Sequence, residues 1–352
     1  MSRFFTSKLS GLKPYTPGEQ PQDMQYVKLN TNESPYPPSP KALQYARDAA
    51  DTLMLYPDPE YKALCAKLAE VCGVSSNQVV VGNGSDEILD FAFMAFGENG
   101  VVFPDTSYGF YSVFGELNRI SAEEIPVKSD LSIDPDDYCN VGKTIFLANP
   151  NAPSGIALTL PELERIITNN PDSVVVIDEA YVDFGAESAV PLTKKYDNVL
   201  VVQTFSKSRS LAGARFGFGI GSPELIADLN RIRYSTNPYN VSRTSAAAAL
   251  GALEDEKITR ENCAKIIATR KRTAETLTSL GFTGPVSSTN FLFVKHDKIS
   301  GKDLYLKLKE RGILVRHFDK ESITDYNRIT IGTDEQMDIL LKAVKEILEE
   351  NA

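Results

Sequence analysis

The sequence has little of the chemistry on which many enzyme classes depend. Its 352 residues include only two histidines and four cysteines, and they include no tryptophan. His296 and His317 do not have the spacing of a typical metal site. A zinc hydrolase or a Ser-His-Asp enzyme would therefore need folding to bring distant histidines to the site. The cysteines form no C-x-x-C pair, which indicates reduced, partly buried thiols. We therefore expect no bound metal, and we expect proton transfer to depend on another base.

Positive charge and long apolar segments are also scarce. Lys and Arg number 37 against 47 Asp and Glu, a formal net charge of −10. Such a chain lacks the positive field that binds nucleic acid or anionic lipid. No stretch approaches the ~18 consecutive apolar residues of a membrane span, and the N-terminus has no signal-peptide run. We expect a soluble, cytoplasmic protein that binds neither nucleic acid nor membranes. The net charge does not exclude binding of small anionic ligands.

Short apolar runs alternate with helical patterns along most of the chain. The runs occupy residues 79–81, 100–104, 143–148, 173–178 and 198–203. Because they lack the alternation of a half-exposed strand, both of their faces should be covered by helices. This pattern predicts an α/β fold with a large, doubly wound, mainly parallel sheet.

The sequence pattern changes near both ends of the chain. A charged helical region at 254–280, three further short apolar runs and a closing helix from Asp334 predict a smaller α+β domain. The proline-rich start predicts an extended arm. We therefore divide the chain into an arm at 1–40 packed with the small domain, a large cofactor-binding domain at 41–250 and a small domain at 251–352.

Residues that suit an anionic ligand follow the expected strands. In open parallel sheets, ligands bind beyond the carboxyl ends of the strands. The glycine-containing segment 82–86 joins a strand to a helix, where free N–H groups attract anions, although a plain helix cap would use the same residues. Asp178 ends a buried run, which is costly unless its carboxylate meets a cation. A structural ion pair would explain Asp178 about equally well.

The most unusual of these residues is a lysine at a strand exit. Lys207 lies between Ser206 and Ser208, and Arg215 follows in the same segment. An amine in a poorly hydrated site loses its proton more easily and can form a Schiff base. With the turn at 149–155, these residues supply what a pyridoxal phosphate site needs: an amine, an acid for the ring nitrogen and an anion cradle.

The order of these segments resembles the fold-type I aminotransferases, and the similarity covers nearly the whole chain. Segments 29–35, 56–59, 312–316 and 328–333 resemble more specifically the histidinol-phosphate aminotransferase family, of the class II enzymes. The resemblance implies a pyridoxal-phosphate-dependent transaminase that moves an amino group between L-histidinol phosphate and 2-oxoglutarate in L-histidine biosynthesis. Alternatives are an aromatic amino-acid transaminase, a pyridoxal-phosphate-dependent decarboxylase of a phosphorylated amino acid, and a regulatory protein that holds the cofactor without turnover.

The resemblance also implies roles for single residues. Lys207 would form the Schiff base and shuttle the proton between the substrate α-carbon and the cofactor. Asp178 would keep the ring nitrogen protonated, Tyr181 would bind the ring oxygen, and Tyr108 would stack on the ring. The phosphate group would be held by Ser85, Asp86, Thr204, Ser206 and Arg215. Tyr56 would reach the phosphate across a subunit interface, so a homodimer is implied.

One position departs from the family's pattern. Members of the family commonly have asparagine directly before the second proline of the turn, where this chain has Ala152. Either Asn151 reaches the ring oxygen through a shifted turn, or Tyr181 makes that contact without it. We predict the first arrangement and include Asn151 among the cofactor-binding residues.

Two arginines are candidate substrate ligands. Arg328 resembles the arginine that binds the substrate carboxylate, for which a planar guanidinium gives two parallel hydrogen bonds. Histidinol phosphate has no carboxylate, so Arg328 would serve glutamate, and Arg316 would bind the phosphate of histidinol phosphate. A surface ion pair of Arg316 with Asp319 or Glu321 is the alternative. The arm would supply two further pocket residues, Asn32 and Tyr15.

Overall fold

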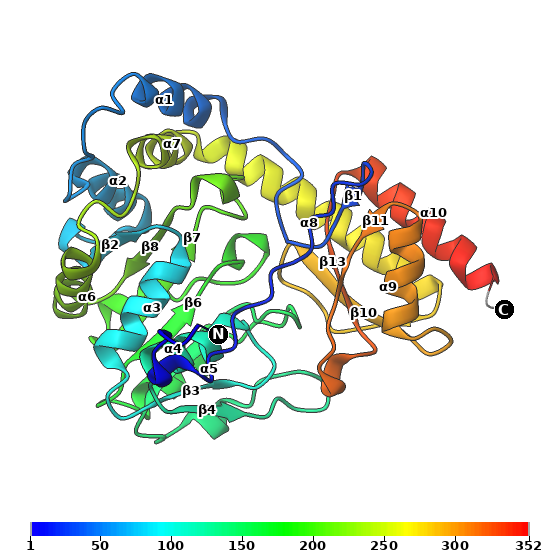
Figure 1. The fold of residues 1–352 in the computed structure, drawn as a ribbon, viewed down its shortest axis with the longest axis horizontal. Coiled ribbons are helices and arrows are strands. Elements are labelled where there is room, and N and C mark those ends of the chain that lie inside the picture. Colours follow the sequence, from blue (N-terminus) through cyan, green and yellow to red (C-terminus); the bar gives the residue numbers. More distant parts are fainter. Residues whose placement is uncertain (1, 351–352) are drawn as a thin grey trace.

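A seven-stranded sheet forms the larger part of the structure, a computed structural model that describes residues 2–350 (Figure 1). In spatial order its strands are β2 (Val79–Gly82), β8 (Gly217–Ile220), β7 (Val199–Thr204), β6 (Val175–Asp178), β5 (Thr144–Ala148), β3 (Val101–Pro104) and β4 (Ala122–Ile125). β8 is antiparallel to both of its neighbours, and the other pairs are parallel. The predicted α/β, mainly parallel sheet is therefore confirmed.

Helices cover both faces of this sheet. They are α1 (Pro40–Ala50), α2 (Lys62–Cys72), α3 (Ser85–Phe96), α4 (Phe110–Asn118), α5 (Leu160–Thr168), α6 (Pro223–Thr236) and α7 (Arg243–Glu254). Within β5, Ile145 and Leu147 pack into one apolar cluster with α2, α5 and α7, whereas Phe146 packs into another with α3, α4 and α6. Burial on both faces explains why these strands lack a polar–apolar alternation.

A second unit follows along α8 (Glu256–Ser279), which runs from α7 to the smaller sheets (Figure 1). One sheet contains β12 (Arg316–His317), β13 (Asn327–Thr330), β10 (Phe291–His296) and β9 (Phe282–Thr283), in that order. The other pairs β1 (Val27–Lys28) with β11 (Ile313–Leu314). The remaining helices of this unit are α9 (Gly301–Glu310) and α10 (Asp334–Glu350). Side chains from α8, α9, α10 and these strands share a separate apolar core.

The N-terminal arm contacts both units. Tyr15 stacks on Phe110 of α4 with ring centroids 4.3 Å apart, and the Lys13 backbone N–H donates to Glu116 of the same helix. Further along, β1 adds to β11 of the smaller unit. The predicted boundaries 1–40, 41–250 and 251–352 stay predictions, and residue 1 and residues 351–352 lie outside the described part of the chain.

Two details of the strands differ from the sequence analysis. The run 312–316, expected as one strand, is divided between β11 and β12, because Ile313 and Leu314 pair with the arm while Arg316 pairs with β13. β4 lies at the sheet edge with mostly exposed side chains, so its sequence contains no apolar run from which a strand could be predicted.

Within residues 2–350, no helix combines the length and the apolarity that a membrane crossing needs.

Phe146 is a direct test of this packing. Its side chain is fully buried and stacks on Phe93 with centroids 4.1 Å apart. Phe146→Ala should lower the free energy of unfolding by about 3–5 kcal/mol, because it leaves a cavity at the centre of the sheet. Denaturant titration of the cofactor-free protein measures the loss. Val286→Ala, at a side chain that is 91% exposed, is the control and should change it by less than ~0.5 kcal/mol. Equal effects of the two substitutions would contradict the proposed core.

Candidate active site

A cavity of about 340 Å³ opens at the carboxyl ends of β5, β6 and β7. This is the edge at which open parallel sheets bind their ligands. Most of the predicted cofactor residues line it: Ser85, Asp86, Tyr108, Asp178, Tyr181, Thr204, Ser206, Lys207 and Arg215. The cavity thus brings together segments that are far apart in the sequence.

Lys207 projects into this cavity from the turn after β7. Its Nζ donates to the Thr31 carbonyl oxygen at 3.3 Å and lies 5.9 Å from the centre of the Tyr181 ring. Burial and the nearby positive charge of Arg328 lower the pKa of Lys207 to about 8. A substantial fraction of the amine is therefore uncharged at mildly alkaline pH and can attack a carbonyl carbon.

Asp178, the last residue of β6, is held in the same cavity by two donors. Its Oδ2 accepts from the Tyr111 hydroxyl at 3.1 Å and its Oδ1 from the Ala180 backbone N–H at 3.2 Å. Burial raises the pKa of Asp178 to about 7, although the bond from Tyr111 opposes the shift. A cationic ring nitrogen beside this carboxylate would favour its charged form. The environment therefore fits a protonated pyridine.

Tyr111 is a residue that the sequence analysis missed. It is fully buried on α4 and provides the hydroxyl that orients Asp178. Its signal was present in the sequence, since it lies three residues after Tyr108 in the same aromatic segment. A helix that begins at Phe110 buries Tyr111 while Tyr108, just before it, lines the cavity.

The opposite end of the cavity is built for an anion. Gly84, with a φ of +82°, precedes α3, whose first N–H groups belong to Ser85 and Asp86. A side chain at Gly217 would approach the Ser85 nitrogen to 2.4 Å, so only glycine leaves this corner open. Arg215 supplies a cation there and donates to Asp86 Oδ2 at 2.9 Å.

The amide of Asn151 points away from the cavity. Its Nδ2 donates to the Thr106 carbonyl at 2.9 Å and to Ser154 Oγ at 3.2 Å, and its Oδ1 accepts from Ser107. Of the two neighbouring turn residues, Ala152 lines the cavity and Asn151 does not. In this structure the polar atoms of Asn151 stabilise the turn itself, and its contact with the cofactor stays a prediction. The alternative, contact through Tyr181 alone, stays a prediction.

Tyr108 and Tyr181 have hydroxyls with defined partners. Tyr108 donates to Asp86 Oδ1 at 2.7 Å, and Tyr181 accepts from Asn32 Nδ2 at 2.9 Å. Burial raises the pKa of Tyr181, so its hydroxyl keeps its proton and can donate to an oxygen in the cavity. Thr204 donates to Ser206 Oγ at 3.0 Å at the anion end.

A second cavity of about 480 Å³ adjoins the first and shares Lys207, Tyr108 and Tyr181 with it. It contains the predicted substrate residues Tyr15, Asn32, Arg316 and Arg328. Lys320 also lines it and forms an ion pair with Asp105 at 3.2 Å, across the two units. The sequence analysis missed Lys320, because an isolated lysine in a polar segment carries no signal.

The two arginines of this cavity lie side by side. Arg316 of β12 and Arg328 of β13 are direct cross-strand partners. Arg316 donates to the carbonyl oxygens of Thr16 and Pro17 at 3.1 and 3.2 Å, and Arg328 donates to that of Asn30 at 3.1 Å. Because these contacts are to neutral carbonyl oxygens, both guanidinium groups keep their positive charge available for an anionic ligand.

Neither of the predicted surface ion pairs forms at Arg316. Asp319, one of the two candidate partners, lies 3.7 Å from His317 Nε2 instead. The guanidinium of Arg316 lies over the Phe318 ring, 5.6 Å from its centre. Arg328 lies over the same ring at 5.7 Å, so the two cations face a shared aromatic wall.

Tyr56 lies outside both cavities in the single chain. Its side chain is 76% exposed and stacks on Tyr239 with centroids 4.5 Å apart. The preceding apolar side chains, Leu53, Met54 and Leu55, are also exposed. A role for Tyr56 at the cofactor therefore depends on a second subunit and stays a prediction.

Comparison with known proteins identifies close relatives over the full length of the chain. The family description "Aminotransferase class I and II" matches residues 24–344. Histidinol-phosphate aminotransferase of Brachyspira hyodysenteriae is 51% identical over 355 residues, which cover 99% of this chain and 100% of the relative. The enzyme of the same name from Marinomonas sp. is 50% identical over 353 residues, again 99% of this chain and 100% of the relative.

A solved structure agrees with these matches. Histidinol-phosphate aminotransferase from Sinorhizobium meliloti, in complex with pyridoxal-5'-phosphate, has a TM-score of 0.85 at 27% identity. The match covers 93% of this chain and 92% of that chain. The chain therefore belongs to the class I and II aminotransferases and, within them, to the histidinol-phosphate aminotransferase family.

Proposed function

We propose that the protein is a pyridoxal-phosphate-dependent transaminase that moves an amino group between L-histidinol phosphate and 2-oxoglutarate, as a step of L-histidine biosynthesis. The observation that carries the proposal is one cavity that holds a lysine of lowered pKa, an oriented carboxylate and an anion cradle. It adjoins a second cavity with two arginines. The two full-length relatives named above, each about half identical to this chain, are themselves called histidinol-phosphate aminotransferases.

The residues of the first cavity fit pyridoxal phosphate. Bound there, the cofactor supplies a ring that accepts negative charge from the substrate α-carbon. Lys207 would hold the cofactor through Nζ, and its amine, when free, would move the proton to and from the substrate α-carbon. Asp178, oriented by Tyr111, would keep the ring nitrogen protonated. Tyr181 would donate to the ring oxygen.

The second cavity would hold the substrates. Two guanidinium groups on neighbouring strands repel each other unless an anion lies between or beside them. We assign the phosphate of histidinol phosphate to Arg316 and the carboxylate of glutamate to Arg328. Tyr15, which stacks on α4, and Asn32, which contacts Tyr181, would close the cavity from the arm.

A specific observation also favours a second candidate, an aromatic amino-acid transaminase. The ring of Phe318 lies beneath both arginines, and Tyr15 lines the same cavity. An aromatic side chain could pack against these rings while Arg328 holds its carboxylate. The role of Arg316 separates the two candidates, because an uncharged aromatic side chain cannot form the ion pair with Arg316 that a phosphate would form.

The protein would act as a homodimer, with Tyr56 contributing to the cofactor site of its partner. The exposed apolar segment before Tyr56 supports this part of the proposal, since such patches often mark contacts between subunits. A cytoplasmic location also remains part of the proposal.

Lys207→Ala should abolish the covalent attachment of the cofactor and lower kcat by about 10³-fold or more, because both attack and proton transfer need the amine. Absorbance of the bound cofactor and steady-state turnover of histidinol phosphate measure the two effects. Lys345→Ala, at an exposed lysine of α10, is the control and should behave as wild type. Turnover retained in Lys207→Ala would refute the proposed chemistry.

Arg316→Ala should raise the KM for histidinol phosphate about 10- to 100-fold and leave the KM for glutamate nearly unchanged, since it removes charge-assisted hydrogen bonds to the phosphate. Arg328→Ala should show the opposite pattern. Half-reactions followed by cofactor absorbance measure each substrate separately. Unchanged use of histidinol phosphate by Arg316→Ala would instead favour the aromatic amino-acid transaminase.

Mixing two inactive variants tests the subunit exchange. In a mixed dimer of Lys207→Ala and Tyr56→Ala, one site has both residues intact only if Tyr56 acts on the partner's site. Half of randomly formed dimers are mixed, and each mixed dimer has one intact site out of two. Co-refolding the two variants should therefore restore up to about a quarter of wild-type turnover. No recovery above the separate variants would show that Tyr56 does not act across an interface.

A further inference from the structure

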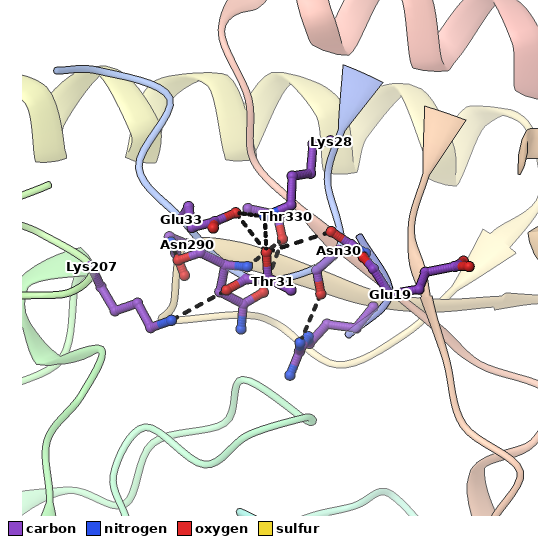
Figure 2. Close-up of polar contacts among 10 residues, drawn as sticks. Glu19, Lys28, Asn30, Thr31, Glu33, Lys207, Asn290 and Thr330 are labelled. Atoms are coloured by element: carbon purple, nitrogen blue, oxygen red, sulfur yellow. Dashed lines mark hydrogen bonds and ion pairs between the residues drawn. The ribbon is translucent and has the colours of Figure 1, made fainter. Parts of the chain in front are cut away.

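Glu33 places a carboxylate in the wall of the cofactor cavity, and the chemistry described above gives it no role. It belongs to the arm, directly after Asn32, and it lines the cavity together with Thr31 and Lys207. Figure 2 shows these side chains converging below α8, with Lys207 reaching Thr31 from the opposite unit. A charged group in this position needs an explanation, since it lies beside the amine on which the reaction depends.

Two donors hold this carboxylate. Glu33 Oε2 accepts from Thr31 Oγ1 at 2.6 Å and also from Lys28 Nζ. Lys28 Nζ donates in addition to Thr31 Oγ1 at 2.7 Å, so the three side chains form a closed set of contacts (Figure 2). Burial raises the pKa of Glu33, but the bonds from Lys28 and Thr31 outweigh this effect and its pKa is lowered. Glu33 is therefore charged at neutral pH.

The same contacts fix the backbone that Lys207 touches. The Thr31 carbonyl accepts from Lys207 Nζ, while the next residue is anchored on the smaller unit. The Asn32 N–H donates to Thr330 Oγ1 at 3.0 Å, and the Asn32 carbonyl accepts from Asn290 Nδ2 at 2.9 Å. The side chain of Thr31 is thus held from one side and its backbone from the other.

We propose that Glu33 is a positioning residue for Lys207: through Thr31 it holds the carbonyl that accepts the free amine, and its negative charge stabilises the amine when it carries a proton. The inference rests on the proposed function, in which Lys207 would act as a free amine while it moves the proton. At that stage the amine needs a fixed acceptor and a nearby counter-charge, and the arm supplies both.

Charges of both signs face the amine. Burial, Arg328 and Arg215 lower the pKa of Lys207, whereas Glu33 and Asp86 raise it. The remaining titratable groups in the wall of the cavity are Tyr108, Asp178 and Tyr181. Asp178 also interacts with the charged amine. Without the charge of Glu33, less negative charge would oppose the two arginines, and the amine would lose its proton at lower pH.

Two substitutions separate charge from structure. Glu33→Gln keeps an acceptor for Thr31 and Lys28 but removes the negative charge, so the pKa of Lys207 should fall by about half a unit or more. Lys28→Met removes the opposing positive charge and should raise that pKa. If Glu33 and Lys28 only maintained the local structure, both substitutions would shift the pKa of Lys207 in the same direction.

The pKa is measured in the cofactor-free protein, from the pH dependence of trace acetylation of Lys207 followed by mass spectrometry. Glu164→Gln, at a carboxylate that pairs with Lys195 outside both cavities, is the matched control. A lower pKa in Glu33→Gln, a higher one in Lys28→Met and no shift in Glu164→Gln support the proposal. Any other pattern overturns it.

Kinetics give an independent readout. Glu33 makes no contact with the arginines assigned to the substrates, so Glu33→Gln should lower kcat several-fold with little change in the KM for histidinol phosphate, and Glu33→Asp should recover part of the loss. An effect confined to KM would contradict a positioning role. The labelling experiment needs no turnover, so failure of this inference is distinguishable from failure of the proposed transamination.

Discussion

The structure depends on keeping two groups of opposite charge poorly hydrated in one cavity. β6 and β7 are parallel neighbours, so Asp178 at the end of one and Lys207 just beyond the other meet at the same edge. Burial moves both toward their neutral forms, because it raises the pKa of the acid and lowers that of the amine. Tyr111, Thr31 and Glu33 limit this cost by hydrogen bonds and charge.

Much of the fold and part of the site could be predicted from the sequence because they follow from local pattern. Strands buried on both faces, such as β5 and β6, appear as short apolar runs, and the residues that follow them must lie at one edge. Lys207, Asp178 and Arg215 were found in this way. β4 was not, because its exposed Glu123 and Glu124 give an edge strand no apolar run.

The rest depends on contacts between distant residues. Nothing local distinguishes Asn151, whose amide turns toward Thr106, from an asparagine that faces the cavity. Glu33 looks like any exposed acid until the fold brings the arm against Lys207. Tyr56 lies exposed on the surface of the single chain, where no local sequence pattern indicates a partner. Sequence patterns report which face of an element is buried, but not which partner buries it.

Three consecutive residues of the arm connect the parts of the site. The Asn30 carbonyl accepts from Arg328, the Thr31 carbonyl accepts from Lys207, and the Asn32 side chain donates to Tyr181. A rigid shift of this segment would therefore alter contacts in both cavities. The arm therefore contributes contacts to both cavities through one short segment. Contacts with Thr330 and Asn290, together with the pairing of β1 with β11, hold this extended segment in place between the two cavities.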